Sequence, residues 1–209
     1  MLINFKDLCN KYHFLPSGII HVGAHNLEEK SDYEIMGVKK IVWIEGNPEV
    51  YLKNMGLVDG SDQILLNELV WELDDVDVDF KITNNLQSSS ILDMSKHLLY
   101  HPDVFVEKSI KMKTKTLDKI ISDIGVDPKE YNFINLDIQG VELRALKGFS
   151  NNLKFIDYIY TEVNTGEVYS NNDTIDEMDS YLSNFGFSRV ETSITQYEWG
   201  DAFYIKNKI

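Results

Sequence analysis

The chain has 209 residues, 34 of them acidic and 20 basic, which gives a formal net charge of −14 at pH 7. A surface this acidic repels a phosphate backbone, so the composition argues against a nucleic-acid partner. A hydrophobic share of 43% and an aromatic share of 11% exclude a disordered chain and indicate a single globular domain over 1–209.

Cysteine content and hydropathy bear on the compartment. Cys9 is the single cysteine of the sequence, so no intrachain disulfide can form, and we expect a reducing, cytoplasmic location. Lys6, Asp7 and Lys11 come before any long apolar run, which is unlike a signal peptide. No run approaches the roughly 20 apolar residues that a membrane span needs, so we expect no membrane span.

The N-terminal part of the chain predicts strands that alternate with helices. Apolar residues recur at helical spacing early in the chain, and a Pro-Ser-Gly turn follows them, so 1–17 is expected to form a helical cap. After the cap the patterns predict strands at 18–22, 40–45 and 63–69, and helices at 28–36 and 48–56.

The middle of the chain is less regular. An acidic cluster at 74–79 lacks the glycine and the closing glutamate of a calcium loop, so a solvated turn is expected there. The stretch 110–116 alternates like a half-exposed strand, and Thr116 is placed to cap a helix that ends at Gly125.

The C-terminal part predicts two more strand–helix units and a hairpin. Thr174 and Glu177 have the spacing of a capping box. The expected strands are 131–137, 155–162, 187–195 and 202–206, and the expected helices are 140–146 and 175–185. Together the segments predict an α/β fold with a mostly parallel sheet, one antiparallel strand and helices on both faces.

Three acidic residues fall where expected strands end. Glu45, Asp137 and Glu162 each lie at the carboxyl end of a strand, and ligands bind at that edge of an open α/β sheet. Glu45 also follows the small residues Gly23 and Ala24 by roughly 20 positions, the spacing at which nucleotide-binding folds place an acid on the ribose hydroxyls. The pattern predicts a nucleotide-type cofactor.

Six short motifs occur in the order found in one enzyme family. They are IHVGAHNLEE at 20–29, VWIEGNP at 42–48, TLD at 116–118, NLDIQGVEL at 135–143, LKG at 146–148 and YTEVN at 160–164. Over nearly all of residues 18–206 the chain resembles the FkbM-type S-adenosylmethionine (SAM)-dependent methyltransferases. The resemblance implies a seven-stranded Rossmann-like class I methyltransferase fold. It also implies methyl transfer to oxygen, often a sugar hydroxyl of a glycan or glycosylated small molecule.

Carried over by position, the resemblance also implies a cofactor site. Gly23 and Ala24 would line the methionine part of SAM, and Glu45 would bind its ribose hydroxyls. Asn67 and Glu68, after the third strand, would lie near the adenine. 

Several positions depart from the family pattern or leave two interpretations open. His21 stands where many methyltransferases have an acid for the cofactor's ammonium group, and Leu27 stands where a third glycine is common. Glu29 either supplies the missing acid or is a helix N-terminal acid favoured by the helix dipole. His25 is a candidate for the cofactor loop, and Gln139 replaces a frequent glutamate.

The candidates for the acceptor side are fewer. Ser89 lies in a polar loop whose length suits a lid over the cofactor. His97 is a candidate general base, although a plain surface position is the simpler interpretation. Trp199 would either stack on a sugar face or be buried in the core.

Asp137 would face the transferred methyl group, and three roles are open for it and its neighbours. Asp137 and Glu162 together would take the proton of the acceptor hydroxyl, or they would hold Mg²⁺ with Asn164. They would equally organise sugar hydroxyls by hydrogen bonds alone.

Two rival functions remain. A nucleotide-sugar oxidoreductase is disfavoured because the second and third glycines of a dinucleotide loop are absent after Gly23. A domain that binds the cofactor or a glycan without turnover would account for His21 and Leu27. The sequence leaves the oligomeric state open, and a homodimer is one option.

Overall fold

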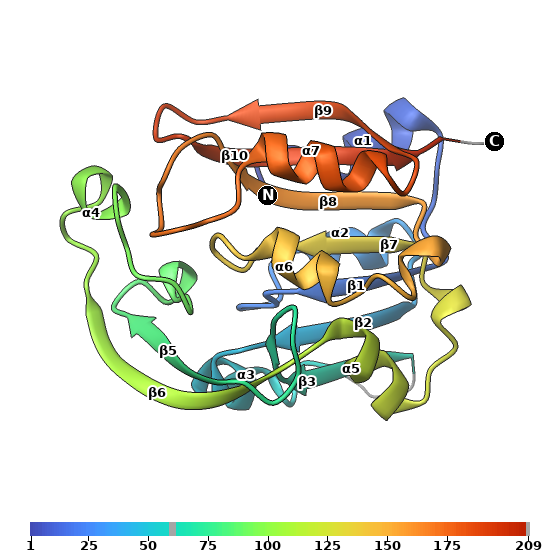
Figure 1. Cartoon of the computed structure of the whole chain (residues 1–209). Helices are drawn as coiled ribbons and strands as arrows, with labels where there is room; N and C mark the ends of the chain where they lie inside the picture. The colour runs from blue at the N-terminus through green and yellow to red at the C-terminus, as the bar shows by residue number, and fades with distance from the viewer. Residues whose placement is uncertain (59–61, 208–209) are drawn as a thin grey trace.

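The computed structural model describes residues 1–58 and 62–207. Seven strands form one sheet in the order β3-β2-β1-β7-β8-β10-β9 (Figure 1). They are β1 (Gly18–Val22), β2 (Lys40–Glu45), β3 (Gln63–Asn67), β7 (Phe133–Leu136), β8 (Tyr158–Asn164), β9 (Phe187–Ile194) and β10 (Trp199–Lys206). Only β10 runs antiparallel to its neighbours, while every other pair in this sheet is parallel. The predicted sheet is confirmed.

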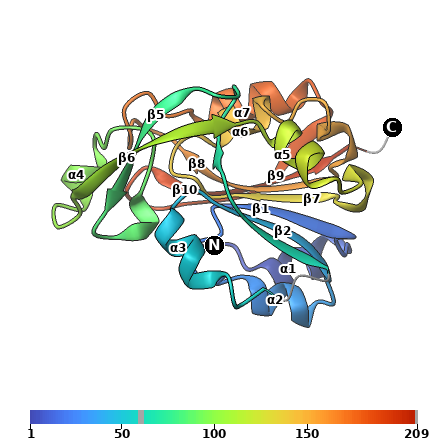
Figure 2. The same cartoon turned by 90° about the horizontal axis from the view of Figure 1, so that it is seen from below.

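Helices cover both faces of this sheet (Figure 2). On one face lie α1 (Phe5–Tyr12), α2 (Lys30–Ile35) and α3 (Pro48–Asn54), and on the other lie α5 (Leu117–Ile124), α6 (Glu142–Lys147) and α7 (Ile175–Ser183). Each face has its own hydrophobic core, because side chains alternate between the two sides of each strand. In the described residues, no helix is both long enough and apolar enough to cross a membrane.

The predicted helix caps are present. The Thr116 hydroxyl accepts a hydrogen bond from the backbone N–H of Lys119, and Gly125 ends α5 in the left-handed conformation. Thr174 and Glu177 form both hydrogen bonds of a capping box at the start of α7. α1 is capped by Asn4, whose side chain accepts from the backbone N–H of Asp7, and the helix lies within the expected N-terminal cap.

A second sheet of three strands was not predicted. It has the order β4-β6-β5, with β4 (Leu69–Val70), β5 (Asp77–Thr83) and β6 (Val106–Lys115). It forms an arm beyond the main sheet, with α4 (His97–Tyr100) at its far end (Figure 1). The predicted third strand at 63–69 is therefore wrong at its end, since β3 stops at Asn67 and Leu69 begins β4.

The acidic segment at 74–79 was also predicted incorrectly in part, because β5 begins at Asp77. β5 pairs antiparallel with β6, which places Asp77 opposite Lys113 and Asp79 opposite Lys111. Opposite charges on facing positions stabilise such a pair by a few tenths of a kcal/mol. Asp77 and Asp79 are part of a strand only because β6 supplies lysines on the facing positions.

The turn after β1 is held between two neighbouring strands. The backbone N–H groups of Gly23 and Ala24 both donate to the Ile44 carbonyl of β2, at 2.9 and 3.0 Å. Gly23 has a φ of +88°, and a Cβ there would lie 1.9 Å from the backbone oxygen of Asp137. Only glycine lets the end of β1 come this close to the end of β7.

Replacing Gly23 with alanine is therefore expected to destabilise the fold, because the ends of β1 and β7 must separate. Gly37 is the matched control, since it has a φ of +84° and nothing within 4 Å of an added Cβ. Both variants strain the backbone, but only Gly23→Ala adds the clash. We expect it to lose about 1–3 kcal/mol more unfolding free energy than Gly37→Ala, measured by urea denaturation. Equal losses would show that the close approach is not needed.

Candidate functional site

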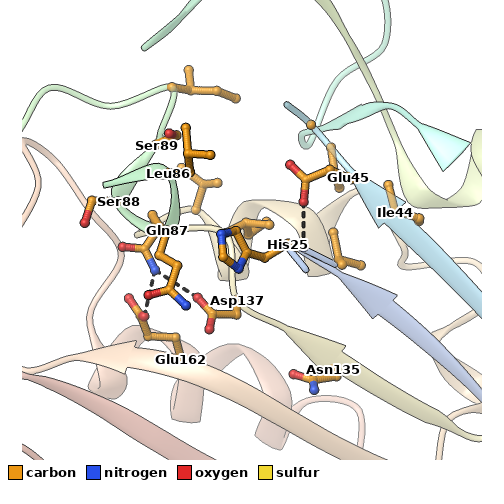
Figure 3. Close-up of a pocket in the computed structure, with 18 of the residues that line it drawn as sticks. His25, Ile44, Glu45, Leu86, Gln87, Ser88, Ser89, Asn135, Asp137 and Glu162 are labelled. Atoms are coloured by element: carbon orange, nitrogen blue, oxygen red, sulfur yellow. Dashed lines mark hydrogen bonds between the residues drawn. The ribbon is translucent and has the colours of Figure 1, made fainter. Parts of the chain in front are cut away.

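A cavity of about 400 Å³ opens at the carboxyl ends of β1, β2 and β7. The strand order reverses between β1 and β7, and such a switch point is where open α/β sheets bind ligands. The volume is in the range of small-molecule sites. Residues 85–89 and Ile91 also line the cavity, and Figure 3 shows Leu86, Gln87, Ser88 and Ser89 across it from β1.

Glu45 ends β2 and is 8% exposed at the cavity wall. One carboxylate oxygen accepts from the backbone N–H of His25 at 2.7 Å (Figure 3). The other accepts from the backbone N–H of Asn47, also at 2.7 Å. Burial raises the pKa of Glu45, while these two hydrogen bonds favour its ionised form. Each oxygen retains a lone pair, so the group is pre-organised to accept from two further donors.

The loop after Gly23 is fixed by side chains. His25 has a φ of +39°, its carbonyl oxygen accepts from the amide of Asn54, and its Nδ1 lies 2.6 Å from Glu28 Oε1. His25, Glu28 and the neighbouring Glu29 all line the cavity. The loop therefore places carboxylates and backbone together at the β1 end of the site.

His21 and Glu29 lie side by side deeper in the same wall. His21 Nε2 is 3.9 Å from Glu29 Oε2, and Glu29 Oε1 is 3.7 Å from the amino group of Met1. Burial lowers the pKa of His21 to about 4, so its ring is neutral at pH 7. Glu29 is thus the acid on this wall that faces an ammonium group.

The other residues predicted to bind the cofactor are placed differently. Glu68 lines the cavity and pairs with Lys115 at 2.6 Å. Ser89 also lines it, and its hydroxyl accepts from the backbone N–H of Thr83. Ala24 is fully buried under the turn, and Asn67 donates to the Glu45 and Gly46 carbonyls, so both lie behind the wall.

Asp137 and Glu162 meet at the other end of the cavity (Figure 3). Asp137 follows β7, and Glu162 lies two residues before the end of β8. One amide nitrogen, Nε2 of Gln139, donates to both carboxylates, at 2.9 Å to Asp137 Oδ1 and 3.0 Å to Glu162 Oε2. The Tyr169 hydroxyl donates to Oε1 of the same amide at 2.6 Å.

The surroundings raise the pKa of both carboxyl groups. The Asp137 side chain is exposed, but it faces the cavity and is surrounded by protein atoms, so desolvation raises its pKa. Glu162 is 6% exposed, and burial together with the charge of Asp137 raises its pKa well above its usual range. A cation that enters the cavity would therefore stabilise the ionised form of both carboxyl groups.

His97 is buried in the cavity wall, at 6% exposure, and not at the surface as the simpler interpretation expected. Its ring centroid is 5.4 Å from that of Tyr169, and burial lowers its pKa, so the ring is neutral. Within the described residues, its Nδ1 has no hydrogen-bond partner. α4 carries it to the same end of the site as Glu162.

The three side chains predicted to hold Mg²⁺ do not converge. Asn164 is fully buried and does not line the cavity, and Gln139 stands between Asp137 and Glu162. Over 1–58 and 62–207, no group of three or more His, Cys, Asp or Glu side chains is arranged to hold a metal ion. The donor set therefore does not fit Mg²⁺.

Phe80, Asn135 and Asp201 are among the lining residues that the sequence did not predict. Asn135 lies two positions before Asp137, so strand alternation alone would have placed both on one face. Asp201 is opposite Glu162 in the β8–β10 register, which the predicted hairpin does not give, because that hairpin pairs β10 with β9. Phe80 comes from β5 of the arm, which no pattern in the sequence placed beside the sheet edge.

Comparison with known proteins gives a family and a fold. The family model of the FkbM methyltransferase domain matches residues 21–189. No match was found among the curated proteins.

Solved structures of methyltransferases share the architecture. Magnesium protoporphyrin IX methyltransferase (ChlM) from Synechocystis PCC 6803 with bound SAM superposes with a TM-score of 0.51 over 96% of this chain and 75% of its own, at 9% identity. Streptococcus pneumoniae Sp1610, a candidate tRNA (m1A22) methyltransferase in complex with S-adenosyl-L-methionine, gives 0.51 over 99% and 75%, at 12% identity. At such identities the likeness shows the fold alone.

Proposed function

Because this chain belongs to the FkbM methyltransferase family, a family of SAM-dependent enzymes, we propose that it transfers the methyl group of SAM to a hydroxyl oxygen of a neutral sugar, in a glycan or a glycosylated small molecule. The observation that carries the proposal is the carboxylate of Glu45, held by two backbone N–H groups beside the Gly23 turn. That geometry suits a pair of ribose hydroxyls.

The charge of the cavity supports SAM as the ligand. Seven carboxyl residues line it: Glu28, Glu29, Glu45, Glu68, Asp137, Glu162 and Asp201. Among the described residues of the wall there is no lysine or arginine. SAM carries a sulfonium and an ammonium group, and buried carboxylates are stabilised by nearby positive charge. Glu29, which already faces the Met1 amino group, is the residue we assign to the cofactor's ammonium.

The remaining cofactor contacts follow from position. Gly23 and His25 line the methionine end with backbone, Glu68 and Ser89 line the opposite wall, and Ala24 and Asn67 support the turn and the end of β2 from behind. When bound, SAM supplies a methyl group on a positively charged sulfur.

The chain's own groups supply alignment and a proton acceptor. We assign Asp137 as the residue that orients the acceptor hydroxyl and Glu162 as its partner in taking the hydroxyl proton. Both carboxylates face the cavity and keep oxygens that other donors can reach. His97 is neutral and, among residues 1–58 and 62–207, has no partner for Nδ1, which makes it the alternative base. Trp199 and Tyr169 line the same end, as an acceptor with an apolar sugar face requires.

Calorimetry separates this function from its rivals. We expect SAM and S-adenosylhomocysteine to bind and NAD not to bind. A screen of neutral glycans with SAM then tests for methyl transfer. Binding of NAD instead of SAM would favour an oxidoreductase, and SAM binding without transfer to any acceptor would favour a binding domain.

A reducing location and a homodimer stay predictions from the sequence.

The acceptor is expected to be uncharged. A phosphorylated acceptor would place like charges next to Asp137, Glu162 and Asp201, which costs several kcal/mol in a confined site. We therefore expect a hexoside to be methylated about tenfold or more faster than its phosphate ester, measured as kcat/KM. We also expect no transfer to RNA or DNA. Methylation of a polynucleotide that weakens with salt would contradict the assignment.

A further inference from the structure

Gln139 is the residue at which this chain departs from the glutamate that is frequent in the family, and it touches both carboxylates of the proposed reaction. We propose that Gln139 is a positioning residue: its amide holds Asp137 and Glu162 as a spaced pair, and Tyr169 fixes the orientation of that amide. The inference rests on the proposed function, because it concerns the same two carboxylates.

The hydrogen bonds determine which way the amide points. The two hydrogens of Nε2 are both used, one for Asp137 Oδ1 and one for Glu162 Oε2. Oε1 accepts from the Tyr169 hydroxyl. A flipped amide would set its oxygen against two carboxylates, so only one orientation satisfies all the groups. Tyr169 is 1% exposed, and its hydroxyl lies 2.6 Å from Gln139 Oε1 but 3.5 Å from the Ser88 carbonyl oxygen, so the Gln139 amide is its closer acceptor.

The backbone at Gln139 is held as firmly as the side chain. Its φ is +59°, a conformation that non-glycine residues rarely adopt. Its carbonyl accepts from the Ser90 hydroxyl at 2.9 Å. The flanking N–H groups of Ile138 and Gly140 donate to the buried carboxylate of Glu142. Contacts from the arm and from α6 thus keep a strained residue in place at a site, as expected where position matters for function.

A glutamine is suited to this position because of the groups around it. The pair is surrounded by further ionisable side chains and the chain's amino group: Met1, His21, Glu29, Glu142, Tyr169 and Asp201. Glutamate is acceptor-only when ionised, so it would add a third charge and would donate to neither carboxylate. Leucine is apolar, ends one atom earlier along the side chain and removes all three hydrogen bonds.

The test compares Gln139→Leu and Gln139→Glu with the parent protein. We expect SAM affinity, measured by calorimetry, to stay within about threefold, because neither residue of the pair is assigned to the ribose. We expect kcat for a glycan acceptor to fall about tenfold or more, because the oxygens that orient the hydroxyl lose their spacing. Gln196→Glu, an exposed change outside the cavity, is the control for added charge.

Tyr169→Phe tests the second half of the proposal. It should lower kcat several-fold in the parent protein and have little further effect in Gln139→Leu, since Tyr169 acts through Gln139. Full additivity of the two losses would overturn this link.

A crystal structure of Gln139→Leu with S-adenosylhomocysteine gives a readout that needs no acceptor. We expect the Asp137 and Glu162 carboxylates to leave their parent positions. If SAM binds to the parent and the carboxylates of the variant do not move, the inference fails while the proposed function stands. If the parent does not bind SAM, the proposed function itself fails.

Discussion

Replacing Asp137 with asparagine is expected to lower the rate of methyl transfer by about 10²-fold or more and to leave SAM affinity within a few-fold of the parent. Asp137 lies at the switch point between β1 and β7, with its carboxylate facing the cavity. As an orienting group and proton acceptor it acts mostly in the transition state, so its loss affects kcat more than binding. Asparagine keeps an oxygen for the Gln139 amide, which preserves the local geometry.

Single-turnover kinetics with an acceptor from the glycan screen would measure this loss, and calorimetry would measure the SAM affinity. Asp173→Asn is a useful control, because Asp173 is a half-buried acid beside Arg144 and does not line the cavity. Near-normal turnover in Asp137→Asn would mean that Asp137 is structural, and the base would then have to be Glu162 or His97. A chelator is expected to leave the parent rate unchanged, since the predicted Mg²⁺ ligands do not converge.

Truncating Glu45 to alanine is expected to weaken SAM binding by about 2–4 kcal/mol, which is roughly 30-fold to 1,000-fold in Kd. Two charge-assisted hydrogen bonds to the ribose would be lost. The backbone N–H groups of His25 and Asn47 would also lose their acceptor, which loosens the loop at the methionine end.

The control for Glu45 is an acid close in sequence that has no contact with the cavity. Glu49 is exposed on α3 and pairs with Lys108, so Glu49→Ala removes the same charge without touching the site. We expect its SAM affinity to match that of the parent. Calorimetry of both variants would measure their SAM affinity, and melting temperatures would check that both are folded. Unchanged affinity in Glu45→Ala would refute the ribose assignment.

Local patterns in the sequence determined much of this protein. The order of strands and helices, the caps at Thr116 and Thr174, and the acid at the end of β2 all depend on residues within a few positions of one another. Parallel strands joined by helices leave few possible arrangements, so a mostly parallel sheet with one antiparallel strand followed from the alternation. The placement of Glu45 and Asp137 at the ligand-binding edge followed with it.

Tertiary structure decided what depends on distant partners. The acidic segment at 74–79 contributes to a strand only because β6, more than 25 residues later, supplies lysines opposite Asp77 and Asp79. His97 lines the cavity because the arm folds back to the sheet edge. No local pattern in the sequence reveals this arrangement. The Gln139 amide joins Asp137, Glu162 and Tyr169 from three separate segments. Hydrogen bonds of this kind depend on geometry within a few tenths of an ångström, which is set by packing of the whole chain and not by residue type.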